Sequence, residues 1–157
     1  MRLRTAMVIA SAVVALSALY SAGLLHAQIT EGTWVRQQSP TTPGDMTMTV
    51  EPCCNGGHRL IYRFKIGNEN SVMVVESPFN GTEVPVMLGG KPSGETMAIK
   101  TVDSRHWTTV LKMNGQMFGT SKAELSADGK ILTVENNITF AAAGQTAGLQ
   151  KEVWIKK

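Results

Sequence analysis

The feature that most constrains this fold is a regular alternation of apolar and polar residues, interrupted by turn residues. In the clearest run, every second residue is apolar, namely Leu60, Tyr62 and Phe64. Successive side chains of a strand point to opposite faces, so a period of two predicts strands with one buried side. Glycine, proline, asparagine and aspartate recur at intervals of about ten residues, which is typical of a β-sandwich or barrel.

Two dipeptides predict tight hairpins and therefore antiparallel neighbours. Asn114-Gly115 and Asp128-Gly129 suit turns whose central residues have positive φ angles. A chain of consecutive hairpins is a meander, and a meander of this length can hide its edge strands by closing into a barrel. The sequence predicts an all-β antiparallel meander of about 8–10 strands that closes into a barrel. The expected strands are 32–38, 46–51, 59–66, 72–76, 83–88, 96–102, 107–113, 116–125, 131–137 and 150–156.

The first 27 residues have the composition of a secretory signal peptide. Arg2 and Arg4 form a positively charged start, residues 6–25 carry no charge, and Ala27 offers a small residue before a cut. The alternative is an uncleaved membrane anchor, because about 20 apolar residues can span a bilayer. We expect residues 1–27 to be removed and residues 28–157 to form a single domain, secreted or periplasmic.

Charge and hydropathy limit the classes of partner that the mature chain is expected to bind. The sequence has 15 Lys and Arg against 12 Asp and Glu, and removal of Arg2 and Arg4 leaves 13 against 12. No basic run remains that could follow a phosphate backbone, which argues against nucleic-acid binding. No second long apolar segment follows residue 27, so we expect a soluble protein without membrane contact after signal removal. The oligomeric state is left open.

Four segments carry a resemblance to a known family. They are Gly32-Thr33-Trp34 and the stretches 80–86, 96–103 and 125–134. Together they resemble small exported bacterial lipocalin-like β-barrel proteins, most of which have no assigned function. The resemblance implies that Trp34 plugs the closed end of the barrel. The chain lacks the Thr-Asp-Tyr motif of a mid-chain lipocalin turn, and lysines stand where lipocalins often have an arginine near the last strand.

Two adjacent cysteines, Cys53 and Cys54, lie in a predicted hairpin turn. An exported protein meets oxidising conditions, so a vicinal disulfide is one possibility. Two free thiols, an intermolecular bridge and a metal site with His58 are the others. Two adjacent cysteines and one histidine match known zinc spacings poorly, so we expect no metal.

The inward faces of three predicted strands form the candidate ligand site. Large apolar residues alternate along them, and we expect these side chains to select a small apolar molecule: Met46, Met48, Tyr62, Phe64, Trp107, Leu111 and Met113. The wall that they form is expected to offer few hydrogen-bond partners. The alternative is a structural or protein-interaction module whose interior is filled by side chains.

Enzyme activity is not expected. Residues 103–106 contain an aspartate, a serine and a histidine, but four consecutive residues in one turn cannot orient a catalytic triad. No phosphate-binding loop and no other catalytic set was found, and no cofactor is expected.

The export interpretation predicts the mass of the mature protein. Protein recovered from its native host should lack residues 1–27, begin near Gln28 and lie outside the membrane fraction, because a signal peptide is removed on export. Intact-mass spectrometry of the fractionated protein measures this. A full-length mass in the membrane fraction would contradict the prediction.

Overall fold

The computed structural model describes residues 29, 31–40, 43–142 and 145–157, and the expected signal peptide lies outside them. Within that part of the chain all regular structure is β-sheet, as the alternating pattern predicted. The ten strands are β1 (Gly32–Arg36), β2 (Met46–Cys53), β3 (Gly57–Ile66), β4 (Glu69–Ser77), β5 (Asn80–Leu88), β6 (Lys91–Thr101), β7 (His106–Met113), β8 (Gln116–Leu125), β9 (Ile131–Ile138) and β10 (Gly148–Lys156).

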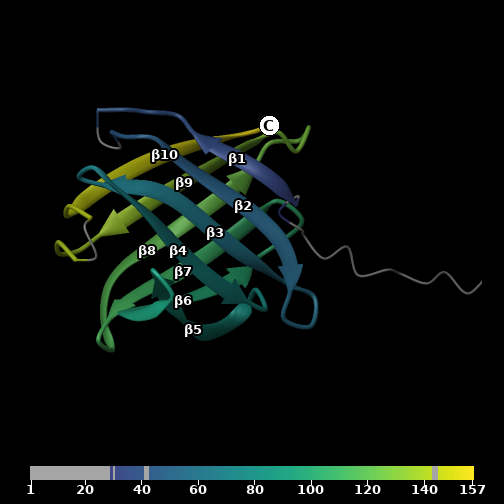
Figure 1. Ribbon diagram of the computed structural model, residues 1–157. Helices are drawn as coiled ribbons and strands as arrows, with labels where there is room; N and C mark the ends of the chain where they lie inside the picture. The colour runs from purple at the N-terminus through teal and green to yellow at the C-terminus, as the bar shows by residue number, and fades with distance from the viewer. Residues whose placement is uncertain (1–28, 30, 41–42, 143–144) are drawn as a thin grey trace, which may run out of the picture.

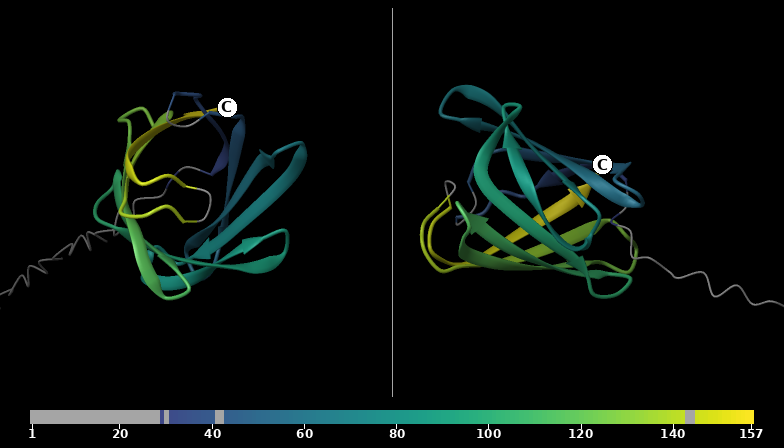
Figure 2. Two further views of the ribbon diagram at one scale, coloured as in Figure 1. Left: turned by 90° about the vertical axis from the view of Figure 1, so that its left-hand side faces the viewer. Right: turned by 90° about the horizontal axis from the view of Figure 1, so that it is seen from below.

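The strands form a closed antiparallel barrel in which each strand pairs with its neighbours in sequence (Figures 1 and 2). The first and last strands complete the ring, with Trp34 opposite Lys156 and Arg36 opposite Trp154. The prediction of an antiparallel meander closing into a lipocalin-like barrel is therefore confirmed. In the described ranges, no helix is long and apolar enough to cross a membrane.

Tight hairpin turns join strands that are consecutive in the sequence. Asn114 and Gly115 have φ angles of 49° and 82°, so the predicted turn of positive φ joins β7 to β8. Gly89 and Gly90 make a similar turn, with φ angles of 56° and 79°. The expected strand at 96–102 therefore begins too late, since β6 already begins at Lys91.

The middle of the chain contains longer strands than the sequence pattern indicated. β4 covers residues 69–77 rather than 72–76, and β5 begins at Asn80 rather than at residue 83. In β4, Asn70 and Ser71 are polar but still pair with β3. The backbone of a polar strand end can form the hydrogen bonds of the sheet, but its side chains show no alternation of apolar and polar residues. The sequence pattern therefore could not locate this end.

The largest hydrophobic cluster gathers toward one end of the barrel. Trp34 is 0% exposed and packs in this cluster with side chains from β2 to β10, among them Val50, Leu125 and Trp154. Phe79, in the turn between β4 and β5, joins the same cluster with a φ of 58°. Positive φ is unusual for a bulky residue, so tertiary packing holds Phe79 in this conformation. Its ring meets His58 edge-on at 5.3 Å between centroids.

Trp34→Ala should destabilise the protein by about 3–5 kcal/mol, because it removes a large side chain from a fully packed site. Leu149→Ala is the matched control, since Leu149 is 80% exposed, and it should change stability by less than about 0.5 kcal/mol. Urea denaturation followed by circular dichroism measures both values. Equal effects of the two substitutions would show that Trp34 does not anchor the core.

Candidate functional site

The interior of the barrel contains a cavity of about 1170 Å³. All ten strands contribute side chains to its wall. Known small-molecule sites range over about 300–1,000 Å³, so this space can enclose a drug-sized ligand. The alternative prediction, that side chains fill the interior, is wrong.

The two ends of the cavity differ in character. Exposed residues from the loop between β1 and β2 and from the turns after β3 and β5 line one end, among them Asp45, Gly67 and Leu88. Buried side chains line the other end, including Phe79 and Trp107. The cavity therefore has a mouth at the first end and a floor in the hydrophobic cluster.

The apolar part of the cavity comes mainly from β2 and β3, which are neighbours, and from β7, which lies across the ring from β2. All seven residues of the predicted ligand site line it: Met46, Met48, Tyr62, Phe64, Trp107, Leu111 and Met113. The ring of Tyr62 also packs edge-on against Trp154, with 5.9 Å between centroids. Burial raises the pKa of the Tyr62 hydroxyl, and the negative charges of Glu152 and Glu95 raise it further.

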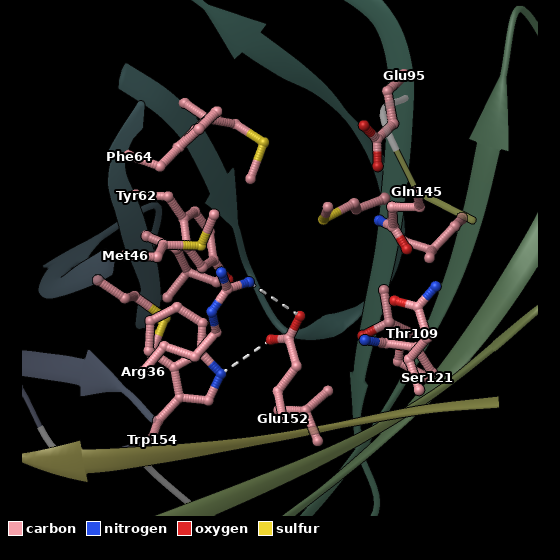
Figure 3. A pocket seen from close by; sticks show the side chains of 18 of the residues that line it. Arg36, Met46, Tyr62, Phe64, Glu95, Thr109, Ser121, Gln145, Glu152 and Trp154 are labelled. Carbon is pink, nitrogen blue, oxygen red and sulfur yellow. Dashed lines mark hydrogen bonds and ion pairs between the residues drawn. The ribbon is translucent and has the colours of Figure 1, made fainter. Parts of the chain in front are cut away.

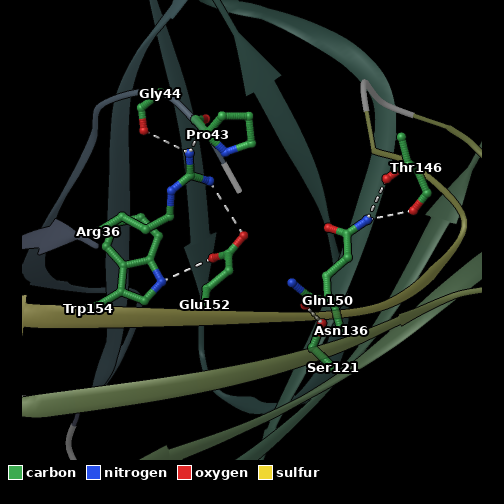
Figure 4. A network of polar contacts seen from close by, with 9 residues as sticks. All are labelled: Arg36, Pro43, Gly44, Ser121, Asn136, Thr146, Gln150, Glu152 and Trp154. Atoms are coloured by element: carbon green, nitrogen blue, oxygen red, sulfur yellow. Dashed lines mark hydrogen bonds and ion pairs between the residues drawn. The ribbon is translucent and has the colours of Figure 1, made fainter. Parts of the chain in front are cut away.

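Strands β1 and β10, which continue the ring beyond β2, carry polar groups that the sequence analysis did not assign to the site. Arg36 of β1 lies 3.6 Å from Glu152 of β10, measured from Nη1 to Oε1 (Figures 3 and 4). Trp154 Nε1 donates to Glu152 Oε2 at 3.1 Å. Arg36 Nη2 also donates to the carbonyl oxygens of Pro43 and Gly44, each at 3.2 Å. This group, the Arg36–Glu152 network, ties the loop at the mouth to the barrel wall.

Burial and charge attraction have opposite effects on the pKa of Glu152. Burial raises the pKa of Glu152, while Arg36 and the hydrogen bond from Trp154 act in the opposite direction. Removing one partner of such a pair leaves an uncompensated buried charge, which is costly. Arg36 and Glu152 therefore depend on each other inside the barrel.

Neutral polar groups extend this wall toward β8 and β9. Ser121 Oγ donates to Asn136 Oδ1 at 2.6 Å, and both residues are buried (Figure 4). Gln150 Nε2 donates to the hydroxyl of Thr146 at 3.1 Å. The prediction of few hydrogen-bond partners concerned only the apolar residues of β2, β3 and β7, and the sequence analysis did not predict these polar groups.

Four lining residues have buried polar atoms that find no hydrogen-bond partner in the described part of the chain. They are Arg36 Nε, Glu95 Oε1, Trp107 Nε1 and Gln145 Oε1. Buried polar atoms are rarely left without a partner, so each one calls for an explanation. The four atoms lie in the wall of one cavity, where a ligand could reach them.

Glu95 is the most unusual of these residues. It lies on β6 and is 5% exposed, and Figure 3 shows it across the cavity from Phe64 and Tyr62. Burial raises the pKa of its carboxyl to about 7 from the ordinary value of 4.5. Near neutral pH this side chain therefore changes between a neutral acid and an anion.

The sequence did contain a weak sign of these polar residues. In β10, Gln150, Glu152 and Trp154 share one face, as do Glu95, Met97 and Ile99 in β6. A polar residue in register with apolar ones on a strand indicates an inward-facing polar group. The pattern could not show that residues from β1, β6 and β10 face one cavity.

Cys53 and Cys54 are joined to each other by a disulfide, with 3.8 Å between their Cα atoms. Cys53 ends β2 and Cys54 begins the turn to β3, away from the cavity lining. Nearby Gly57 has no room for a Cβ, which would come within 2.1 Å of the carbonyl oxygen of Ser77. Across the described ranges, no group of three or more His, Cys, Asp or Glu side chains is placed to hold a metal ion.

Comparison with known proteins supports the fold. No protein-family model matches the chain, and no curated protein sequence matches it. A crystal structure of a mutant of the fluorescent protein UnaG is similar to it, with a TM-score of 0.57 and 10% sequence identity. The similarity covers 82% of this chain and 96% of that one. At this low identity the match shows a shared barrel fold.

The pKa of Glu95 predicts a specific pH dependence of stability. The unfolded chain loses this proton near pH 4.5 and the folded chain near pH 7, so ionisation of Glu95 destabilises the fold progressively as pH rises between these values. Glu95→Gln should therefore raise stability at pH 8 by on the order of 2 kcal/mol and change it little at pH 4.

Glu135→Gln is the control, because Glu135 is exposed on β9. Urea denaturation of the wild-type protein and both variants at pH 4 and pH 8 measures the difference. A Glu95→Gln effect that is the same at the two pH values would contradict the prediction.

Proposed function

We propose that the protein is an exported lipocalin-like barrel that binds a small, mainly apolar molecule in its cavity. The observation that carries this proposal is the cavity of about 1170 Å³ inside a closed barrel. Interiors normally pack at high density, and an eight-stranded barrel is just wide enough for side chains to fill or for one small ligand. A ten-stranded barrel that keeps such a volume open is suited to hold a molecule.

The composition of the wall supports an apolar ligand with a fatty chain or an aromatic ring. Five methionines line the cavity in addition to aromatic side chains: Met46, Met48, Met73, Met97 and Met113. Methionine is flexible and polarizable, so it adapts to apolar groups of varied shape. A fully polar ligand would lose its water contacts along this wall without replacing them.

Export of the protein remains a proposal supported by two observations. The N-terminal sequence has the charge and hydropathy of a signal peptide, and Cys53 is oxidised with Cys54. Disulfides persist mainly in oxidising compartments such as the periplasm and the extracellular space. We further propose that the protein binds its ligand without transforming it.

Binding in the cavity can be tested by placing a bulky side chain in the cavity wall. Thr109 and Thr108 are neighbours on β7, and Thr109 lines the cavity whereas Thr108 is exposed. An environment-sensitive apolar dye should bind the wild-type protein saturably, and Thr109→Trp should weaken binding by about tenfold or more, a loss of about 1.4 kcal/mol. Thr108→Trp should leave the dissociation constant nearly unchanged.

Fluorescence titration measures the binding, and circular dichroism confirms the fold of each variant. Decanol should displace the dye from the wild-type protein. Failure of the dye to bind natively folded protein, or equal loss of binding in the two variants, would overturn the proposed function.

A further inference from the structure

The buried charges of the cavity wall are unequally compensated. Arg36 is held by Glu152 and by two loop carbonyl oxygens, so its positive charge is already paired. Glu95 is buried on β6, and its Oε1 has no hydrogen-bond partner within the described ranges. The other charged lining residues, Asp45 and Lys65, are exposed at the mouth. Among the buried lining residues that the structure describes, the one charge that lacks a counterion is therefore the negative charge of Glu95.

We propose that Glu95 recognises a protonated amine, so that the ligand class is an apolar chain or ring system bearing a cationic nitrogen. This inference rests on the proposed function, because it names the polar group of the molecule bound in the same cavity. An ammonium group donates strong, charge-assisted hydrogen bonds to a carboxylate. It would supply the partner that Glu95 lacks.

The surroundings of Glu95 favour a cation over an anion. The rings of Tyr62 and Phe64 lie across the cavity from Glu95 (Figure 3), and aromatic faces attract cations. A carboxylate ligand would instead be repelled by ionised Glu95. It would meet an Arg36 guanidinium that is already paired with Glu152 and bonded to the loop carbonyls, and in which Nε is the atom that lacks a partner.

Protonation of Glu95 should control this recognition. Burial raises its carboxyl pKa to about 7, and an ammonium group binds the ionised form. Besides Asp45 and Lys65 at the mouth, the other ionisable groups facing the cavity are Tyr62 on β3, Arg36 on β1 and Glu152 on β10. On the neighbouring strands, Glu83 of β5 and Lys112 of β7 pair with each other and do not line the cavity. His106 of β7 pairs with Asp103 and does not line the cavity either, so no basic side chain of β5 or β7 competes for Glu95.

Three probes with the same chain length separate the possibilities. Decylamine, decanol and decanoate are each used below their micellar concentrations to displace the apolar dye from the protein. At pH 8 decylamine is protonated, as alkyl ammonium groups have pKa values of about 10. It should bind about tenfold or more tightly than decanol, a difference of about 1.4 kcal/mol, and decanoate should bind least tightly.

The pH dependence of amine binding and a matched variant then test whether Glu95 is the group that binds the amine. Decylamine should bind about tenfold more weakly at pH 6 than at pH 8, because most Glu95 carboxyls are protonated at pH 6. Decanol should bind equally at both pH values. Glu95→Gln should abolish the preference for the amine and its pH dependence, whereas Glu135→Gln should preserve both.

The outcomes distinguish this inference from the proposed function. Equal binding of the three probes, or an amine preference that persists in Glu95→Gln, overturns the role of Glu95 and leaves the binding function standing. No binding of the dye or of any probe overturns both proposals. If Glu95→Gln does not fold, the wild-type preference and its change between pH 6 and pH 8 still decide the result.

Discussion

Closure of the barrel between β1 and β10 is the constraint on which the rest of the structure depends. An open meander would leave two strands with unpaired backbone groups along their edges. Pairing of Trp34–Arg36 with Trp154–Lys156 removes both edges and joins the two ends of the sheet. The same seam brings Arg36 and Glu152 together inside the barrel. One short ladder thus completes the fold and creates the charged part of the cavity wall.

The number of strands explains why the interior has both a core and a cavity. Barrel diameter grows with strand number, and side chains can just fill an eight-stranded barrel. Ten strands enclose more space than their inward side chains occupy. The largest hydrophobic cluster lies toward the floor, around Trp34, Phe79 and Leu125. The space above it remains open toward the loop between β1 and β2 and the turns after β3 and β5.

Polar groups inside the barrel follow two different arrangements. Arg36 and Trp154 each bond to Glu152, and Ser121 bonds to Asn136, so these contacts stabilise a defined wall geometry. Glu95 has no comparable arrangement, and its burial opposes ionisation. A buried carboxyl that destabilises the fold is retained where it serves another purpose. Carboxyls with strongly shifted pKa values are found mainly at functional sites. This contrast makes Glu95 the residue around which the ligand hypothesis is built.

The sequence by itself determined the strands, most of the turns and the inward faces of β2, β3 and β7. These features are local, because the period of two and the Asn114-Gly115 turn act over a few residues. It did not locate the polar start of β4, the turn at Gly89 and Gly90, or the polar side of the cavity. Only the tertiary structure decided that Arg36, Glu95 and Glu152 share one interior and that space remains between them. The distances between these residues depend on barrel closure and on the number of strands. Both are established by pairing between strands that are far apart in the sequence.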